Sequence, residues 1–87
     1  MRELRLRTDD LYWQAIDGSV IALEARASTY LSANPAGALL WSALEQGTTR
    51  SGLAEELVSA YGIAREAALA DADAFLAELD AHDLLAR

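Results

Sequence analysis

The sequence contains no cysteine and no lysine, and it has a single histidine, His82. Without cysteine the chain has no disulfide framework, thiolate nucleophile or zinc knuckle. Most pairs of nucleophile and base cannot be assembled from this composition, and no glycine-rich phosphate loop is present. His82 also lacks partners at metal-ligand spacing. Carboxylate chemistry remains open on composition alone, but an 87-residue domain offers little enclosed pocket. We therefore expect no enzyme activity, no catalytic residues, no metal and no cofactor.

Basic residues are scarce: seven arginines stand against fourteen aspartates and glutamates, which gives a formal net charge of -7. Proteins that bind nucleic acids neutralise phosphates with clustered Lys and Arg. The last helical segment instead carries one arginine, Arg65, against five acidic residues, so we expect no nucleic-acid partner. These are Glu66, Asp71, Asp73, Glu78 and Asp80. The chain also lacks the roughly eighteen apolar residues of a membrane span. After the basic residues 1–7, Thr8-Asp9-Asp10 stands where a signal peptide needs an apolar run. We expect a cytoplasmic protein without membrane contact.

The chain, expected to fold as one domain over residues 1–87, is divided at Asn34-Pro35 into halves of different character. Before this point, alternating apolar residues predict strands over Leu11–Ile16, Ser19–Glu24 and Ser28–Ser32. Asp17-Gly18 between the first two is a strong signal for a two-residue hairpin. Leu4 and Leu6, which alternate with arginines, suggest an additional strand.

The second half predicts three helices. Asn34 is a good N-cap, Pro35 suits the first helical position, and Gly47 stops the first helix. A second helix ends at Gly62, and a third runs from about residue 64 to residue 83. The fold class is therefore α+β, a three-stranded antiparallel sheet followed by three helices, similar to a winged helix-turn-helix. Fold class alone does not confer DNA binding.

The order of these features resembles the PqqD-like family of RiPP precursor recognition elements, which bind leader peptides of ribosomally made, post-translationally modified peptides. The resemblance covers roughly Leu11 to Leu85, and its strength lies in order and spacing because no single motif is very specific. The residues that carry it are Asn34-Pro35-Ala36-Gly37, Trp41 six positions after Pro35, Tyr61-Gly62 at the end of the second helix, and Asp71-x-x-x-Phe75-Leu76-x-x-Leu79.

The resemblance implies that the leader joins the sheet as an additional antiparallel strand between the third strand and the third helix. The implied leader-binding residues are Ser28, Thr29, Tyr30 and Leu31 on the strand, and Asp71, Ala74, Phe75 and Glu78 on the helix. The four helix residues fall on one side at i, i+3, i+4 and i+7. Proline at Leu31 is expected to spoil strand addition by removing an edge N–H.

Several of these side chains also have a purely structural interpretation. Trp13 and Trp41 favour the core or its rim, and Phe75 leans toward the core rather than the groove. Tyr30 is open between the two interpretations. The acidic run on the last helix is often simply a solvated face.

The function that the resemblance implies is that of a non-catalytic peptide chaperone. It would hold a precursor peptide for a leader peptidase and a cyclase or another maturase. The chain is most similar to the stand-alone proteins of lasso peptide clusters, so the implied precursor is a lasso peptide precursor. Two alternatives stay open: a chaperone of the pyrroloquinoline quinone pathway that presents its peptide to a radical enzyme, and an acidic winged-helix interaction adaptor. An unpaired third strand would also be a site for dimer formation through the open edge.

Overall fold

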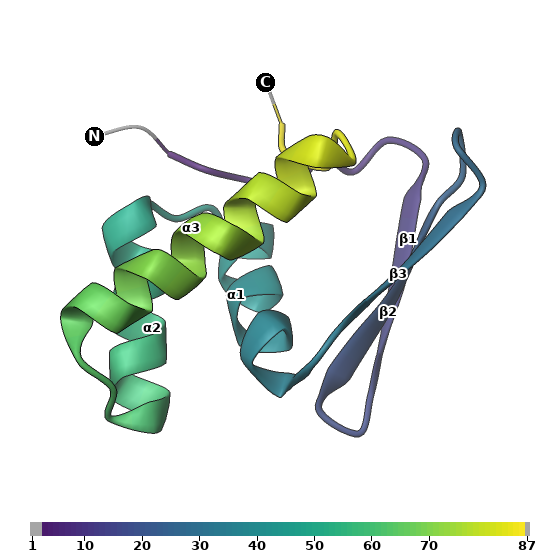
Figure 1. Cartoon of the computed structure of the whole chain (residues 1–87). Helices are drawn as coiled ribbons and strands as arrows, with labels where there is room; N and C mark the ends of the chain where they lie inside the picture. Colours follow the sequence, from purple (N-terminus) through teal and green to yellow (C-terminus); the bar gives the residue numbers. More distant parts are fainter. Residues whose placement is uncertain (1–2, 87) are drawn as a thin grey trace.

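The computed structural model describes residues 3–86 of the chain. A three-stranded antiparallel sheet is followed by three helices (Figure 1), which confirms the predicted α+β fold class. The elements are β1 (Leu11–Ile16), β2 (Ser19–Glu24), β3 (Thr29–Ala33), α1 (Pro35–Gln46), α2 (Arg50–Tyr61) and α3 (Arg65–Ala81). No helix in the described part of the chain is long and apolar enough to cross a membrane.

The sheet is built from two hairpins in the order β1-β2-β3, so β3 is an edge strand. Asp17 and Gly18 form the first turn with φ values of 50° and 78°, the left-handed conformation that a two-residue type I′ hairpin requires. Trp13 pairs with Ala22, and Ala22 pairs with Leu31 on the other side. Apart from the Ile16–Ser19 pair beside the turn, the register therefore carries each row of side chains across all three strands.

The N-terminal residues do not form the additional strand that their alternation suggested. Leu4 makes an isolated bridge to Thr48, and Leu6 makes one to Leu85, both outside the sheet. Leu6 is nevertheless 2% exposed. Leu4 is partly buried against the same core. The alternation with arginines therefore reflects two inward side chains on an extended segment that crosses the helices, which give the same sequence pattern as a strand.

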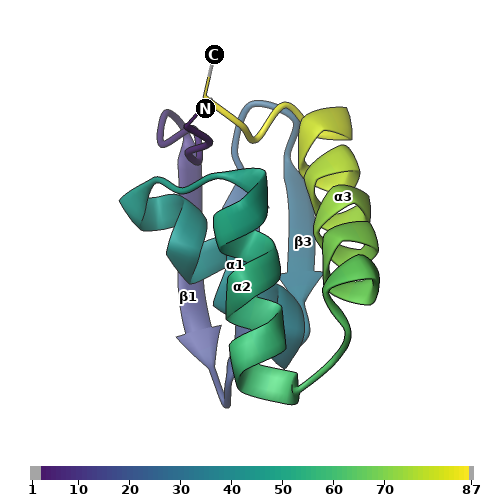
Figure 2. The same cartoon turned by 90° about the vertical axis from the view of Figure 1, so that its left-hand side faces the viewer.

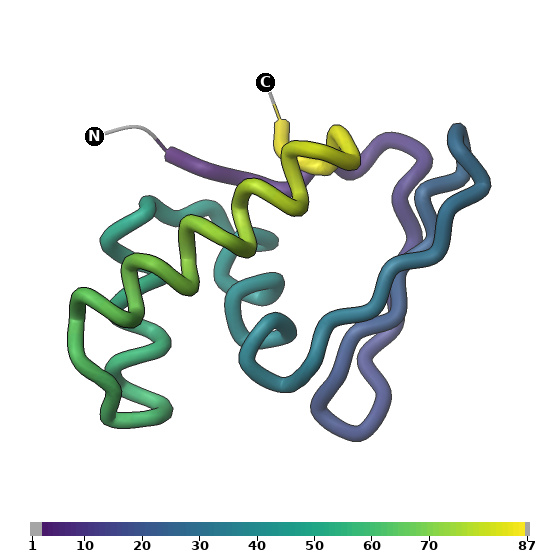
Figure 3. The backbone as a smooth tube through the Cα atoms, viewed as in Figure 1, coloured from purple at the N-terminus to yellow at the C-terminus, as the bar shows by residue number. Residues whose placement is uncertain are grey.

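The extended N-terminal segment passes beside the residues that follow α3 (Figure 3). The amide of Arg7 donates to the carbonyl of Leu84 over 2.8 Å, and the amide of Ala86 donates to the carbonyl of Arg5 over 2.8 Å. These bonds tie the extended N-terminal segment to the residues that follow α3.

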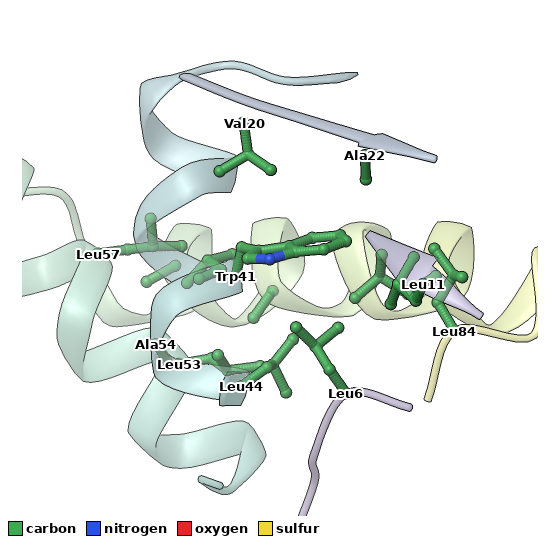
Figure 4. Close-up of a cluster of buried hydrophobic side chains, with 14 residues drawn as sticks. Leu6, Leu11, Val20, Ala22, Trp41, Leu44, Leu53, Ala54, Leu57 and Leu84 are labelled. Carbon is green, nitrogen blue, oxygen red and sulfur yellow. The ribbon is translucent and has the colours of Figure 1, made fainter. Parts of the chain in front are cut away.

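The hydrophobic core lies between the sheet and the helices (Figure 4). Leu44 of α1, Leu53 of α2 and Leu84 after α3 are fully buried. Trp41 is also buried and meets Trp13 of β1 edge to face, with ring centroids 5.6 Å apart and the rings inclined by 71°. Both tryptophans therefore belong to the core or its rim, as predicted, and the Trp13 indole donates to Glu45 Oε1 over 2.7 Å.

A buried carboxylate holds the turn between β2 and β3. Glu24 is 5% exposed and accepts a hydrogen bond of 2.8 Å from the Arg7 guanidinium. It also accepts from the amides of Arg26 and Ala27. Burial acts to raise the pKa of Glu24, but the hydrogen bonds from Arg7 and from the two amides outweigh it, and the pKa lies below its ordinary value. The ionised carboxylate thus fixes the N-terminal end of β3.

Candidate functional site

A groove runs between the edge strand β3 and helix α3. Figure 2 shows the two elements beside one another, running in opposite directions. α3 packs mainly on α2, whereas β3 packs on β2, so space remains between helix and strand. A pocket of ≈190 Å³ occupies the middle of this space. It is lined by Val20, Ala22, Leu31, Ser32, Ala33, Asn34, Gly37, Trp41, Phe75, Glu78 and Leu79.

The pocket is apolar because each element turns its core-facing side toward it. Val20 and Ala22 are inward residues of β2, and Trp41 reaches the pocket from α1. The floor depends on Gly37 in the first turn of α1. A Cβ at this position would lie 3.0 Å from the Ala33 Cβ and 3.2 Å from Phe75 Cε1. A larger residue would therefore press on Ala33 of β3 and on Phe75 of α3 and fill part of the groove.

A second, shallower pocket of ≈400 Å³ adjoins the first near the start of α1. Asn34, Gly37, Phe75 and Glu78 line both pockets, so the two form one continuous groove. The residues added by the second pocket are Ala36, Leu40, Leu57, Asp71 and Ala74. Hereafter the groove means the residues that line these two pockets.

The groove brings together five of the eight residues proposed from the sequence: Leu31, Asp71, Ala74, Phe75 and Glu78. The four helix residues share one side because the helical period fixes their spacing. Phe75 is half-buried. It packs against the core and also lines the groove, so the core and groove interpretations both apply to this one ring.

The remaining three residues lie elsewhere. Ser28 has φ 53° in the turn before β3 and is outside both the strand and the groove. Thr29 lines a separate polar pocket beside His82, and its hydroxyl donates to the carbonyl of Ala27 over 3.2 Å. Tyr30 points to the opposite face of the sheet, where its side chain is 73% exposed.

Sequence reasoning did not assign several groove residues to the site. Ser32, Ala33 and Asn34 continue β3 into α1 along the groove, and Val20 and Leu79 line it from β2 and α3. The third strand begins and ends one residue later than expected, at Thr29–Ala33, which shifts the site toward α1. Gly37 in the first turn of a helix was the available signal, because glycine there commonly marks a close approach.

The register identifies which backbone groups of β3 face the open edge. In a two-residue hairpin the flanking residues, here Ile16 and Ser19, exchange hydrogen bonds, and such pairs alternate along an antiparallel ladder. The amide of Ala25 donates to the carbonyl of Asp10, which continues this alternation. The even-numbered residues of β2 therefore bond to β3, and Tyr30 and Ser32 direct their N–H and C=O groups outward.

This assignment changes the expected effect of proline at Leu31. Leu31 pairs with Ala22 of β2, and the alternation directs its N–H into the sheet. Proline at Leu31 would therefore break the β2–β3 ladder rather than block the edge. Ser32 is the exposed position at which proline removes an edge N–H and leaves that ladder intact.

The charges near the groove lie on α3. Asp71 and Glu78 are the only ionisable residues among the groove residues, and both are exposed. Asp73, on the neighbouring side of α3, accepts bonds of 2.6 Å and 2.8 Å from Arg50 of α2. These bonds hold the pKa of Asp73 below its ordinary value and fasten α3 to α2, away from β3. Among the described residues, no cluster of His, Cys, Asp or Glu could hold a metal ion.

A family model described as coenzyme PQQ synthesis protein D (PqqD) matches residues 19–85, which include β2, β3 and all three helices. The chain belongs to the PqqD family. No curated protein matches the chain in sequence.

Two solved structures resemble this PqqD-family chain over nearly its whole length. The structure of TbiB1 in complex with the TbiA(beta) leader peptide is 26% identical, with a TM-score of 0.85 and 93% of each chain covered. A lasso peptide synthetase B1 complexed with the leader peptide is 25% identical, with a TM-score of 0.83. That match covers 97% of this chain and 98% of the other.

Proposed function

We propose that this protein is a leader-peptide-binding adaptor that captures a RiPP precursor by adding the leader as a strand to the open edge of β3. The observation that carries the proposal is the groove, an apolar channel bordered on one side by outward N–H and C=O groups of Tyr30 and Ser32. The two similar structures, each solved with a leader peptide, support the same assignment.

Backbone pairing alone does not supply the affinity. The two outward residues offer four backbone groups, and each hydrogen bond contributes about 1 kcal/mol net. Ordering about five leader residues costs about 1–2 kcal/mol each. Binding therefore depends on apolar anchors, each of which contributes about 1.5–3 kcal/mol when buried. The central pocket of ≈190 Å³ suits individual side chains, since sites for small-molecule ligands are usually larger.

The role that follows is one of presentation rather than chemistry. A partner maturase, such as a leader peptidase or a cyclase, would act on the core peptide while the leader stays in the groove. Holding the leader raises the effective concentration of the core peptide beside that enzyme without any new chemical group. The groove residues suit this role, because most are apolar and the polar ones are Ser32, Asn34, Asp71 and Glu78, with no histidine, cysteine or lysine among them.

The decisive experiment measures fluorescence polarisation of a labelled leader, taken from the precursor reading frame beside the gene, against Ser32→Pro and Ala15→Pro. Ser32→Pro removes an N–H from the β3 edge, whereas Ala15→Pro removes one from the opposite sheet edge in β1. We expect Ser32→Pro to weaken binding at least tenfold, about 1.4 kcal/mol, and Ala15→Pro to change it less than twofold.

Circular dichroism and thermal melting serve as the control that both variants fold. Equal affinities for the two variants would show that the leader does not use the β3 edge. No binding of the leader to the wild-type protein would reject the proposed function and favour an acidic interaction adaptor. The name of the matching family model supports a second source of peptide, a pyrroloquinoline quinone precursor. Its leader, measured in the same assay, would decide between the two pathways by relative affinity.

A further inference from the structure

We propose that the bound leader is recognised on both faces of the sheet, with a large apolar or aromatic leader side chain packed on Tyr30 at the outer face. This inference rests on the proposed function, and it assigns a second contact that the groove does not provide. The groove receives the leader side chains that point toward the helices. Tyr30 would receive one that points away from them.

The outer face of the sheet is apolar and exposed, although the protein carries a net charge of -7. Tyr12 is 62% exposed and Tyr30 is 73% exposed, and Ile16 and Ile21 are each more than 40% exposed. A shallow pocket of ≈360 Å³ lies among these side chains. None of the outward-facing residues in the three described strands is charged: they are Tyr12, Gln14, Ile16, Ser19, Ile21, Leu23, Tyr30 and Ser32. The face is therefore suited to an apolar contact.

The register places Tyr30 at the open end of a cross-strand row. Tyr12 pairs with Leu23, and Leu23 pairs with Tyr30, so the three side chains stand next to one another on the outer face. In an antiparallel sheet, residues directly opposite each other project on the same side. A strand added to β3 therefore places the residue opposite Tyr30 at the next position of this row. The residue opposite Leu31 points instead into the groove.

The geometry at Tyr30 leaves the opposite leader residue within reach of the large phenol ring, although a hydrogen-bonded pair is the wider of the two antiparallel pair types. Tyr30 directs both its N–H and its C=O outward, so the leader residue opposite it forms a hydrogen-bonded pair, with Cα atoms about 5.5 Å apart. The phenol ring can then cover a neighbouring apolar side chain, and cross-strand pairs of this kind are favourable. The side chains of the bound leader segment would thus point alternately into the groove and toward the outer face, and both sets would be apolar.

The size of the exposed patch favours the leader over a stable protein partner. Each of the four exposed side chains, Tyr12, Ile16, Ile21 and Tyr30, has at most about 250 Å² of surface, and at most 73% of it is exposed. The exposed area of the patch is therefore smaller than the roughly 800 Å² that each partner buries in a standard stable interface. A leader side chain needs only the part of the patch that adjoins the β3 edge, and strand addition brings it there.

The test compares Tyr30→Thr with Tyr12→Thr, using the labelled leader and its variants with alanine at each position in turn. Threonine keeps the strand propensity at both sites. Tyr12 is the matched control because it occupies the same face and the same row, two strands from the open edge. We expect Tyr30→Thr to weaken leader binding roughly 3- to 10-fold and Tyr12→Thr to change it less than 1.5-fold.

One alanine-substituted leader should bind wild-type protein and Tyr30→Thr with nearly equal affinity, because its outward side chain is already missing. That position should lie next to an anchor position whose substitution weakens binding to both proteins. Equal effects of Tyr30→Thr and Tyr12→Thr would overturn the inference. The inference would also be overturned if Tyr30→Thr kept full affinity while Ser32→Pro lost binding. That result would preserve the proposed function and leave the outer face to a different partner. A wild-type protein that binds no leader would reject both proposals.

Discussion

Glu24 is the residue through which we expect pH to act on the turn that precedes β3. Its pKa lies below the ordinary value of 4.5, so the ionised form contributes stability above that value. The contribution is lost as pH falls through the lowered pKa of the folded state. We expect Glu24→Gln to be clearly less stable than wild type at pH 7, because it leaves the Arg7 guanidinium buried without its carboxylate partner. The difference should shrink as pH falls below 4.5, where the unfolded chain takes up the proton first.

Urea unfolding at several pH values between 3 and 7 measures this difference. Glu56→Gln, at an exposed position on α2, is the control and should follow the wild-type curve. A stability gap between wild type and Glu24→Gln that stayed constant down to pH 3 would contradict the assignment.

At the residue scale, the sequence predicted side-chain sets on helices better than on strands. Asp71, Ala74, Phe75 and Glu78 were placed on one side of α3 correctly, because any helix of 3.6 residues per turn brings these positions together. Tyr30 was placed on the groove edge with Leu31, but the two point to opposite faces. The direction of each strand residue depends on register, which the turn geometry sets and which a short apolar run does not reveal.

At the scale of elements, the junction between β3 and α1 links stability to the groove. Asn34 caps α1 by accepting a hydrogen bond of 2.9 Å from the amide of Gly37, and it lines the groove. Thr49 caps α2 in the same way, accepting a bond of 3.0 Å from the amide of Gly52. Each cap removed by alanine costs about 1 kcal/mol of stability.

We therefore expect Asn34→Ala and Thr49→Ala to lower the free energy of unfolding by similar amounts but to differ in leader binding. Asn34→Ala should reduce the affinity several-fold, because the start of α1 and the end of β3 form the groove floor. Thr49→Ala should leave it nearly unchanged. Denaturant titration and fluorescence polarisation measure the two effects separately. Parallel losses of stability and binding in both variants would mean that the groove responds only to global stability.

The elements themselves followed from local signals. Asp17-Gly18 fixed the hairpin, and Asn34, Pro35, Gly47 and Gly62 marked the helix ends observed in the structure. The N-terminal segment was assigned wrongly, because two alternating leucines cannot distinguish a strand from an extended crossing. Its burial comes from tertiary contacts with residues near both Thr48 and Leu85, far apart in sequence.

For the whole molecule, the net charge of -7 does not govern leader binding if apolar anchors supply most of the affinity. We expect the affinity for the leader to fall less than threefold between 50 and 500 mM NaCl, since screening acts mainly on exposed charges. Fluorescence polarisation across this range measures the dependence. A steep loss of affinity with salt would indicate that Asp71 and Glu78, rather than the apolar floor, hold the peptide.

The paired ends of the chain determine how this domain could be joined to other proteins. Arg5 and Arg7 bond to residues on either side of Leu85, so the chain leaves the fold almost where it enters. Neither end segment lines the groove. Such a unit can be inserted into a surface loop of a host protein without distorting the host or the domain. The two junctions with the host chain would lie close together. The edge of β3 would stay accessible in such a fusion. If the leader binds there as proposed, the domain would be portable as a docking module for engineered maturation enzymes.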